Sequence, residues 1–178
     1  KTSHSMHNRN FNHLLKNGGK VHLKEKGKTR LAKINHVTRD LSRLSDSDVI
    51  IIYIQTNYHE SLIKHIQPYL RDGQILMLSP GYLSTAYVLK HCSDINLTIM
   101  EAQSSFIDCR ISEPGTVNIS FRNVRNPLGI YPADHKQRSQ EILDQLGFPF
   151  TYLPSVIEAA LHNPNLIVHT VGAIMSIP

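Results

Sequence analysis

The chain has 178 residues, of which 40% are hydrophobic and 19% are charged. This composition excludes a disordered or fibrous chain, and it matches one ordinary globular domain with part of a second. No apolar run approaches the roughly 20 residues that span a bilayer, and residues 1–5 lack the apolar stretch of a signal peptide. We therefore predict a cytoplasmic protein that binds no membrane.

The first predicted elements are an amphipathic helix over residues 7–17, which ends at Gly18 and Gly19, and then a basic hairpin. The few residues before the helix fit the tail of a strand. The net charge of +5 is modest, and basic residues gather only in residues 20–33. No aromatic residues interleave there to stack bases, so we interpret the segment as a solvated hairpin face and predict no nucleic-acid partner. Anionic small molecules remain compatible with this charge.

Residues 48–54 form a continuous apolar, β-branched run, which predicts a strand buried on both faces of a parallel sheet. A polar loop and a helix over residues 58–70 follow it. The same order repeats after a turn, with strand 74–79, the loop Pro80 and Gly81, helix 84–91, and strand 96–100 ending at Glu101. Alternating strands and helices imply parallel strands joined by right-handed crossovers. The predicted fold class is therefore α/β, a Rossmann-like doubly wound parallel sheet.

Ligands of such sheets bind beyond the carboxyl ends of the strands, so chemistry is expected in residues 55–57, 79–82 and 101–104. After residue 107 the pattern changes to short strands suited to antiparallel pairing, a helix over 133–146, a strand over 150–153 and a helix over 155–161. A last helix begins at Asn163 and Pro164 and runs through Met175. Its residues are apolar on nearly every side, so we expect further protein around it.

No G-x-G-x-x-G turn joins a first strand to a first helix anywhere in the sequence. If the sheet is a dinucleotide fold, about 30 residues before residue 1 are expected to supply that strand, loop and helix. We predict a dinucleotide-binding domain over residues 1–153 without its glycine loop, and the start of a helical catalytic domain over residues 154–178.

Three segments together resemble the opine dehydrogenases: residues 48–59, residues 101–110, and residues 165–169, in which an Asn and a His lie four apart. This family joins the amino group of an amino acid to a 2-keto acid and reduces the resulting imine with NADH or NADPH. By that resemblance His169 matches the catalytic His, and Asn165 matches the Asn one helical turn before it. The family's partner Asp lies much later, and the sequence has no residue at a matching position.

The residues around His169 give a separate reason to consider this helix. If all are helical, His162, Asn165 and His169 lie at i, i+3 and i+7 on one face. An imidazole suits proton transfer to a carbonyl or carbinolamine oxygen, and Asn165 suits a substrate carboxylate or carbonyl. The alternative makes His169 a packed core histidine. We favour catalysis for His169 and a solvent-facing role for His162.

The predicted cofactor is NADP or NAD, and the sequence favours NADP. Gln55 and Thr56 are placed to touch the nicotinamide half, and Pro80 with Gly81 either lets the backbone approach the cofactor or forms a plain turn. An NAD-preferring fold usually ends its second strand with an acid, but residues 3–9 contain none. Arg9 is therefore a candidate ligand of the 2′-phosphate, unless it is an exposed residue at the start of a helix.

Two charged residues complete the candidate site. Glu101 ends a buried strand at the ligand edge, where we assign it to the cofactor site and expect it to orient a substrate amine or a loop. Arg110 offers a bidentate clamp for a substrate carboxylate. The alternative for Arg110 is an ion pair with Asp108 or Glu101.

Other functions remain open. A dehydrogenase that acts on a hydroxy acid and resembles the ketopantoate reductases or 2-hydroxy-acid dehydrogenases would use a Lys as its acid, but residues 163–176 contain no Lys. A dinucleotide-sensing module that has lost the reaction is the alternative outside enzymes. Cys92 and Cys109 form no metal motif and are interpreted as reduced and structural. The sequence does not decide the substrates, the stereochemistry or the oligomeric state, for which a homodimer stays open.

Overall fold

The computed structural model describes residues 2–176, and for residues 2–6 and 164–167 it describes the course of the backbone alone. Two compact units make up the chain. Lys1–Leu41 and Ile107–Asn123 form the first, called the hairpin unit below, and Ser42–Phe106 and Val124–Pro178 form the second, called the sheet unit. The predicted boundary after residue 153 is of another kind, because it concerns the start of a catalytic domain, and it stays a prediction.

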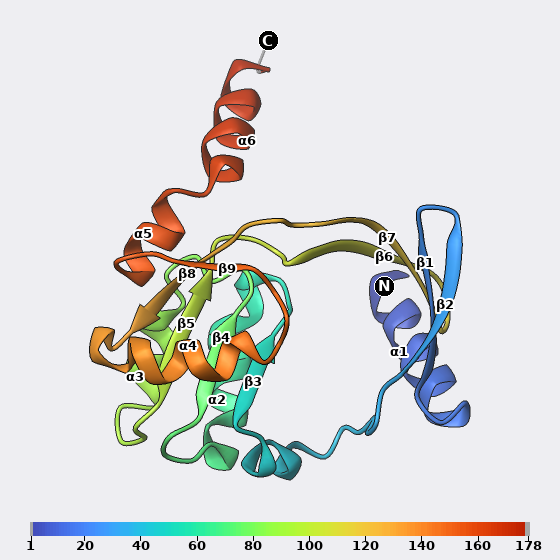
Figure 1. Ribbon diagram of the computed structural model, residues 1–178, viewed down its shortest axis with the longest axis horizontal. Coiled ribbons are helices and arrows are strands. Elements are labelled where there is room, and N and C mark those ends of the chain that lie inside the picture. Colours follow the sequence, from blue (N-terminus) through green and yellow to red (C-terminus); the bar gives the residue numbers. More distant parts are fainter. Residues whose placement is uncertain (1, 177–178) are drawn as a thin grey trace. The chain divides into compact units, whose positions relative to one another are not determined.

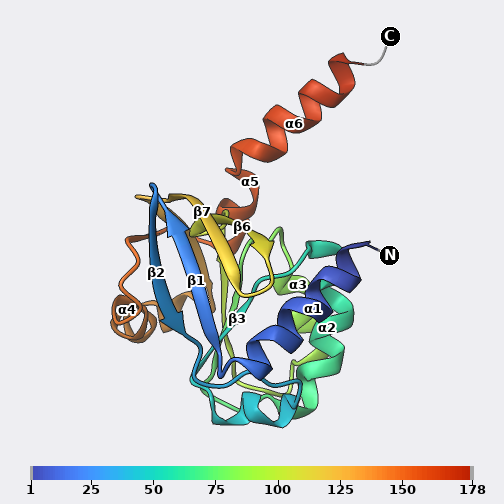
Figure 2. The ribbon, with the colours of Figure 1, turned by 90° about the vertical axis from the view of Figure 1, so that its right-hand side faces the viewer.

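The hairpin unit consists of helix α1 and four strands in the order β2-β1-β7-β6 (Figure 2). The elements are α1 Thr2–Lys16, β1 Lys20–Glu25, β2 Lys28–Lys33, β6 Ile107–Glu113 and β7 Thr116–Arg122. The predicted basic hairpin is confirmed, since β1 and β2 pair antiparallel around Lys26 and Gly27, whose φ angles are 48° and 74°. Two central residues with positive φ make the turn that matches the twist of a hairpin.

Helix α1 begins five residues earlier than predicted. Residues 3–6 lie in its first turns, so the expectation of a strand tail before residue 7 is wrong. Gly115, in the turn between β6 and β7, donates its N–H to Asn10 Oδ1 at 2.9 Å and thereby ties this turn to α1. The antiparallel pairing predicted for the strands after residue 107 is confirmed for β6 and β7.

The sheet unit contains five strands in the order β3-β4-β5-β8-β9 (Figure 1). Its first three are parallel, and the intervening helices are α2 and α3, as a βαβ pattern predicts. The elements are β3 Val49–Ile52, α2 His59–Ile66, β4 Ile75–Leu78, α3 Thr85–His91, β5 Thr98–Ala102, β8 Asn126–Tyr131, α4 Lys136–Asp144 and β9 Phe150–Tyr152. The Rossmann-like α/β fold is confirmed.

The core of the sheet unit lies around β4 and β5, in which every residue is buried. Strand β3 is different, because it is the edge strand of this sheet. Ile50 and Ile52 are buried, but Ile51 is 41% exposed. The prediction that this strand is buried on both faces is therefore wrong within the sheet unit, where only one neighbouring strand pairs with it.

Two helices end the described chain, α5 Val156–Leu161 and α6 Pro164–Met175. The Ser155 hydroxyl caps α5 by accepting the N–H of Glu158 at 3.1 Å. The chain leaves the helical conformation at His162 and Asn163, so His162 does not share one helix with His169, as the predicted common face required. Among the described residues, no helix combines the length and the apolar character needed to cross a membrane.

Candidate functional site

The three loops that follow β3, β4 and β5 meet at the carboxyl edge of the parallel strands. The N–H of Gly81 donates to the carbonyl of Ala102 at 3.1 Å, and the Ser79 hydroxyl donates to the carbonyl of Ser104 at 3.4 Å. The His59 ring joins the loop after β3 through the carbonyl of Ile54 at 3.3 Å. The fold therefore brings together the three segments that the sequence singled out.

The turn after β4 has an unusual backbone. Tyr82 and Leu83 are consecutive residues with φ angles of 51° and 66°. Left-handed conformations cost non-glycine residues about 1–3 kcal/mol each, and such strain concentrates at functional sites. Because the strain persists only where surrounding contacts impose it, the groups that hold this turn are of interest.

The side chain of Glu101 holds this turn through hydrogen bonds. This side chain is completely buried, and its two oxygens accept three hydrogen bonds. One comes from the Leu83 N–H at 2.8 Å, and two come from the N–H and hydroxyl of Thr85, each at 2.7 Å. Thr85 opens α3, so the carboxylate also faces the positive end of that helix.

Gly81 is required by the same carboxylate. A Cβ at this position would overlap with the side chain of Glu101. The sequence predicted that Pro80 and Gly81 let the backbone approach the cofactor, which stays a prediction; the close approach in the structure is that of the Glu101 side chain to Gly81.

His59, at the start of α2, is a completely buried histidine beside this turn. Its Nδ1 lies 2.7 Å from the Ser84 hydroxyl, and its Nε2 lies near the Ile54 carbonyl. Since a carbonyl only accepts, Nε2 carries the proton, and Nδ1 accepts from Ser84. Loss of solvation lowers the pKa of His59, which the Ile54 hydrogen bond and the charge of Glu101 partly oppose. The imidazole is thus held neutral.

Asn163 is a buried polar residue that the sequence did not assign to the site. It is 1% exposed, and its Nδ2 donates to the Tyr82 hydroxyl at 2.8 Å and to the Gln103 carbonyl at 2.5 Å. The Gln103 side chain in turn donates to the carbonyl of His162. The available signal was the Asn-Pro pair at the start of the last helix, which indicates a cap and says nothing of distant partners.

Comparison with known proteins identifies one curated relative. An opine dehydrogenase of Arthrobacter sp. (strain 1C) is 24% identical over 137 residues, which cover 75% of this chain and 38% of that protein. The chain resembles the opine dehydrogenases. No model of a known protein family matches it.

Solved structures agree on the fold of this opine dehydrogenase-like chain. An octopine dehydrogenase in complex with NADH and pyruvate matches 96% of the chain with a TM-score of 0.67 and 16% identity, over 49% of its own length. A 2-dehydropantoate 2-reductase from Porphyromonas gingivalis W83 matches 96% with a TM-score of 0.71 and 16% identity, over 60% of its own length. The chain thus spans between 38% and 60% of the length of these three proteins.

The residues predicted to contact cofactor and substrate differ in their exposure in this opine dehydrogenase-like chain. Gln55 is exposed and Thr56 half-buried in the loop after β3, and Pro80 is half-buried in the turn after β4. His169 lies in α6 with its side chain exposed. The side chain of Asn165 lies outside the described residues. The roles assigned to these residues stay predictions.

Arg9 and Arg110 belong to the hairpin unit. Arg9 is exposed within α1 and does not directly follow a strand, as its assignment had assumed, and its role as a ligand of the 2′-phosphate stays a prediction. The Arg110 side chain is 82% exposed, and its Nη1 lies 3.0 Å from Asp108 Oδ1. The ion pair with Asp108, which was the alternative for Arg110, is confirmed.

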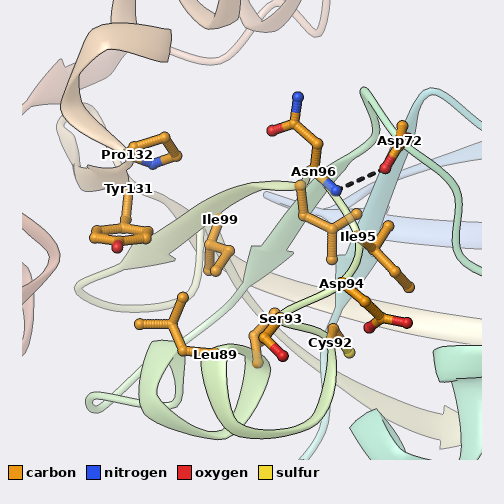
Figure 3. Close-up of a pocket in the computed structure, with 12 residues that line it drawn as sticks. Asp72, Leu89, Cys92, Ser93, Asp94, Ile95, Asn96, Ile99, Tyr131 and Pro132 are labelled. Atoms are coloured by element: carbon orange, nitrogen blue, oxygen red, sulfur yellow. Dashed lines mark hydrogen bonds between the residues drawn. The ribbon is translucent and has the colours of Figure 1, made fainter.

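A hollow of about 410 Å³ lies at the opposite, amino edge of β4 and β5 (Figure 3). Asp72 accepts the N–H of Asn96 there at 2.7 Å. The hollow is also lined by Cys92, a free thiol whose pKa is raised by burial and by the charge of Asp94. A raised pKa disfavours the reactive thiolate, which agrees with a structural role for this cysteine.

Proposed function

We propose that the chain forms part of an NAD(P)H-dependent dehydrogenase of opine dehydrogenase type, which condenses an amino acid with a 2-keto acid by reduction. The observation that carries the proposal is the meeting of three strand-end loops around a strained turn at the carboxyl edge, where this fold binds its ligands. The resemblance to an opine dehydrogenase supports the reaction class.

The residues at this edge fit the nicotinamide half of a dinucleotide. Tyr53, 48% exposed, packs edge-on against the buried ring of Phe106, with centroids 6.3 Å apart, and provides an apolar surface beside the polar Gln55 and Thr56. Such a mixed surface suits a planar ring that carries an amide. A bound reduced nicotinamide supplies the hydride. Gln55, Thr56 and the turn at Tyr82 would hold the ring.

Proton transfer is assigned to His169, and recognition of a substrate carboxylate or carbonyl to Asn165. An imidazole has a pKa near neutrality and suits transfer of a proton at the carbonyl or carbinolamine oxygen. For Glu101 we propose that it orients the turn, because its oxygens already accept three hydrogen bonds. Arg110 stays a candidate carboxylate ligand. Preference for NADP, a cytoplasmic location and homodimerisation also stay predictions.

A second candidate is a reductase that acts on a hydroxy acid, as the similarity in fold to a 2-dehydropantoate 2-reductase suggests. The two reactions differ in their requirement for an amine. A non-catalytic dinucleotide sensor would bind the cofactor and turn over neither substrate pair.

The whole protein is first titrated with NADH and NADPH separately, following the fluorescence of the reduced nicotinamide. Oxidation of the preferred cofactor is then measured with pyruvate alone, with pyruvate plus an amino acid, and with 2-dehydropantoate. We expect turnover that requires the amino acid. Replacement His169→Ala should lower kcat about 10²–10⁴-fold, and His65→Ala, an exposed histidine on α2, serves as the control. Absence of binding would sink the proposal.

A further inference from the structure

The start of α6 is tied to two strand-end loops of the sheet unit by side-chain hydrogen bonds. Asn163, immediately before Pro164, donates to Tyr82 in the loop after β4 and to Gln103 in the loop after β5. Gln103 returns a bond from its side chain to the carbonyl of His162. The connection with the loop after β5 is therefore reciprocal, whereas the loop after β4 only accepts, through the Tyr82 hydroxyl.

These partners are distant in sequence, since Asn163 and Tyr82 are 81 residues apart. At the other end of the connection, Tyr82 belongs to the strained turn that Glu101 holds. The backbone that carries the Tyr82 side chain is thereby held by Glu101. Asn163 is buried and meets its acceptors on these two loops, so the start of α6 cannot shift without breaking bonds that the buried amide cannot replace with water.

We propose that Asn163 is a positioning residue, which sets the register of α6, and so of Asn165 and His169, against the edge that receives the nicotinamide. The catalytic consequence of this inference rests on the proposed function. The hydrogen bonds that hold the start of α6 do not depend on it. Enzymes lose about 10²-fold in rate when a reacting group is misplaced by about 1 Å.

The test uses the whole protein with the variants Asn163→Ala, Tyr82→Phe and their combination. Asn163→Ala should lower kcat about 10–100-fold while the Kd for the reduced dinucleotide changes less than about twofold, because the Asn163 amide is buried and donates to Tyr82 and Gln103. Tyr82→Phe removes one acceptor and should lower kcat less. The double variant should match Asn163→Ala within about twofold, because partners in one network are not additive.

A second readout needs no cofactor. Amide hydrogen exchange of residues 164–170 in the free protein should become faster, by about tenfold or more, in Asn163→Ala and to a smaller extent in Tyr82→Phe. Tyr87→Phe is the matched control, since Tyr87 is 37% exposed and Tyr82 36%. Asn126→Ala controls for stability alone, because Asn126 is another buried asparagine, with its Nδ2 3.3 Å from the Pro149 carbonyl.

Loss of stability in Asn163→Ala with unchanged kcat and unchanged exchange, as expected for Asn126→Ala, would overturn the inference. If the unaltered protein neither binds a dinucleotide nor turns over, the proposed function fails, and the exchange of residues 164–170 still decides whether Asn163 holds the start of α6.

Discussion

The two ends of β4 are both fixed by buried polar side chains, but the chemistry differs. At the amino end, Gln74 is completely buried and its amide donates to the carbonyls of Leu44 and Ser47 at 2.8 and 2.7 Å. Its oxygen accepts the N–H of Arg71 at 2.8 Å. At the carboxyl end, the buried groups are Glu101 and His59, which are both ionisable.

The backbone differs in the same way. Near Gln74 the positive φ angle of 80° belongs to Gly73, for which it costs little. After the carboxyl end, positive φ angles fall on Tyr82 and Leu83. At the amino end, a neutral amide beside an unstrained backbone connects the sheet to the neighbouring loop. At the carboxyl end, ionisable groups hold a strained turn, which indicates that one geometry of that turn is needed. The carboxyl end therefore carries the features of a ligand site, and the amino end those of a structural joint.

The largest effect on this difference between the two ends of β4 is expected from Glu101→Gln. The amide replaces an acceptor with an NH₂ group that faces the donors of Leu83 or Thr85, so at least one buried N–H loses its partner. We expect a loss of about 2–4 kcal/mol in the free energy of unfolding and weaker dinucleotide binding. Urea unfolding and nicotinamide fluorescence measure the two effects. Undiminished binding by a folded variant would show that the turn is only structural.

A smaller effect is expected from Gln74→Leu, which keeps the volume approximately and leaves three partly buried backbone groups without their amide partner. The free energy of unfolding should fall by about 1–3 kcal/mol. Dinucleotide affinity should be the same as in the unaltered protein, because the residue lies at the opposite end of β4. A parallel fall in affinity would mean that the two ends are coupled, contrary to the comparison.

The smallest effect should come from protonation of His59, because it involves one proton. The pKa of His59 is lowered in the folded protein, so between the ordinary value of about 6.5 and the folded value the unfolded chain binds the proton and the folded chain does not. This contribution is complete above pH 6.5 and is lost as the pH falls below it. The Tm between pH 8 and 5 should therefore fall more steeply than in His59→Gln. Equal slopes would exclude His59 as the cause.

Much of the sheet unit could be predicted from local patterns. The run at 49–52 has the β-branched residues of a strand, and Asp72 with Gly73 marks the turn before β4. The predicted exposure of β3 was wrong because the number of neighbouring strands is not encoded in the strand itself. The α1 start was wrong because residues 3–6, of which three are polar, carry neither helical nor strand periodicity.

The contacts at the carboxyl edge were beyond local patterns. Glu101 could be placed at the edge, since it follows a buried strand, but its partners Leu83 and Thr85 are 18 and 16 residues away. The contact of Asn163 with Tyr82 could not be predicted either, because it depends on how the fold brings the start of α6 to the loop after β4. Positive φ at Tyr82 and Leu83 has no sequence signal either, because neither residue type favours that conformation.

Strand β1 pairs in parallel with β7, with His22 opposite Thr116. The three parallel strands β3, β4 and β5 lie between these two residues in the sequence. On the ribosome, residues 49–102 emerge before β7 does, so the three parallel strands are available to assemble while β1 still lacks one of its neighbours. We therefore expect the hairpin unit to close only after β3, β4 and β5 have been synthesised, although β1 and β2 precede all three in the sequence. A cut in the β6–β7 turn would give two fragments that each contain parts of both units, so the units would stay covalently linked. The cut should nevertheless delay the pairing of β7 with β1.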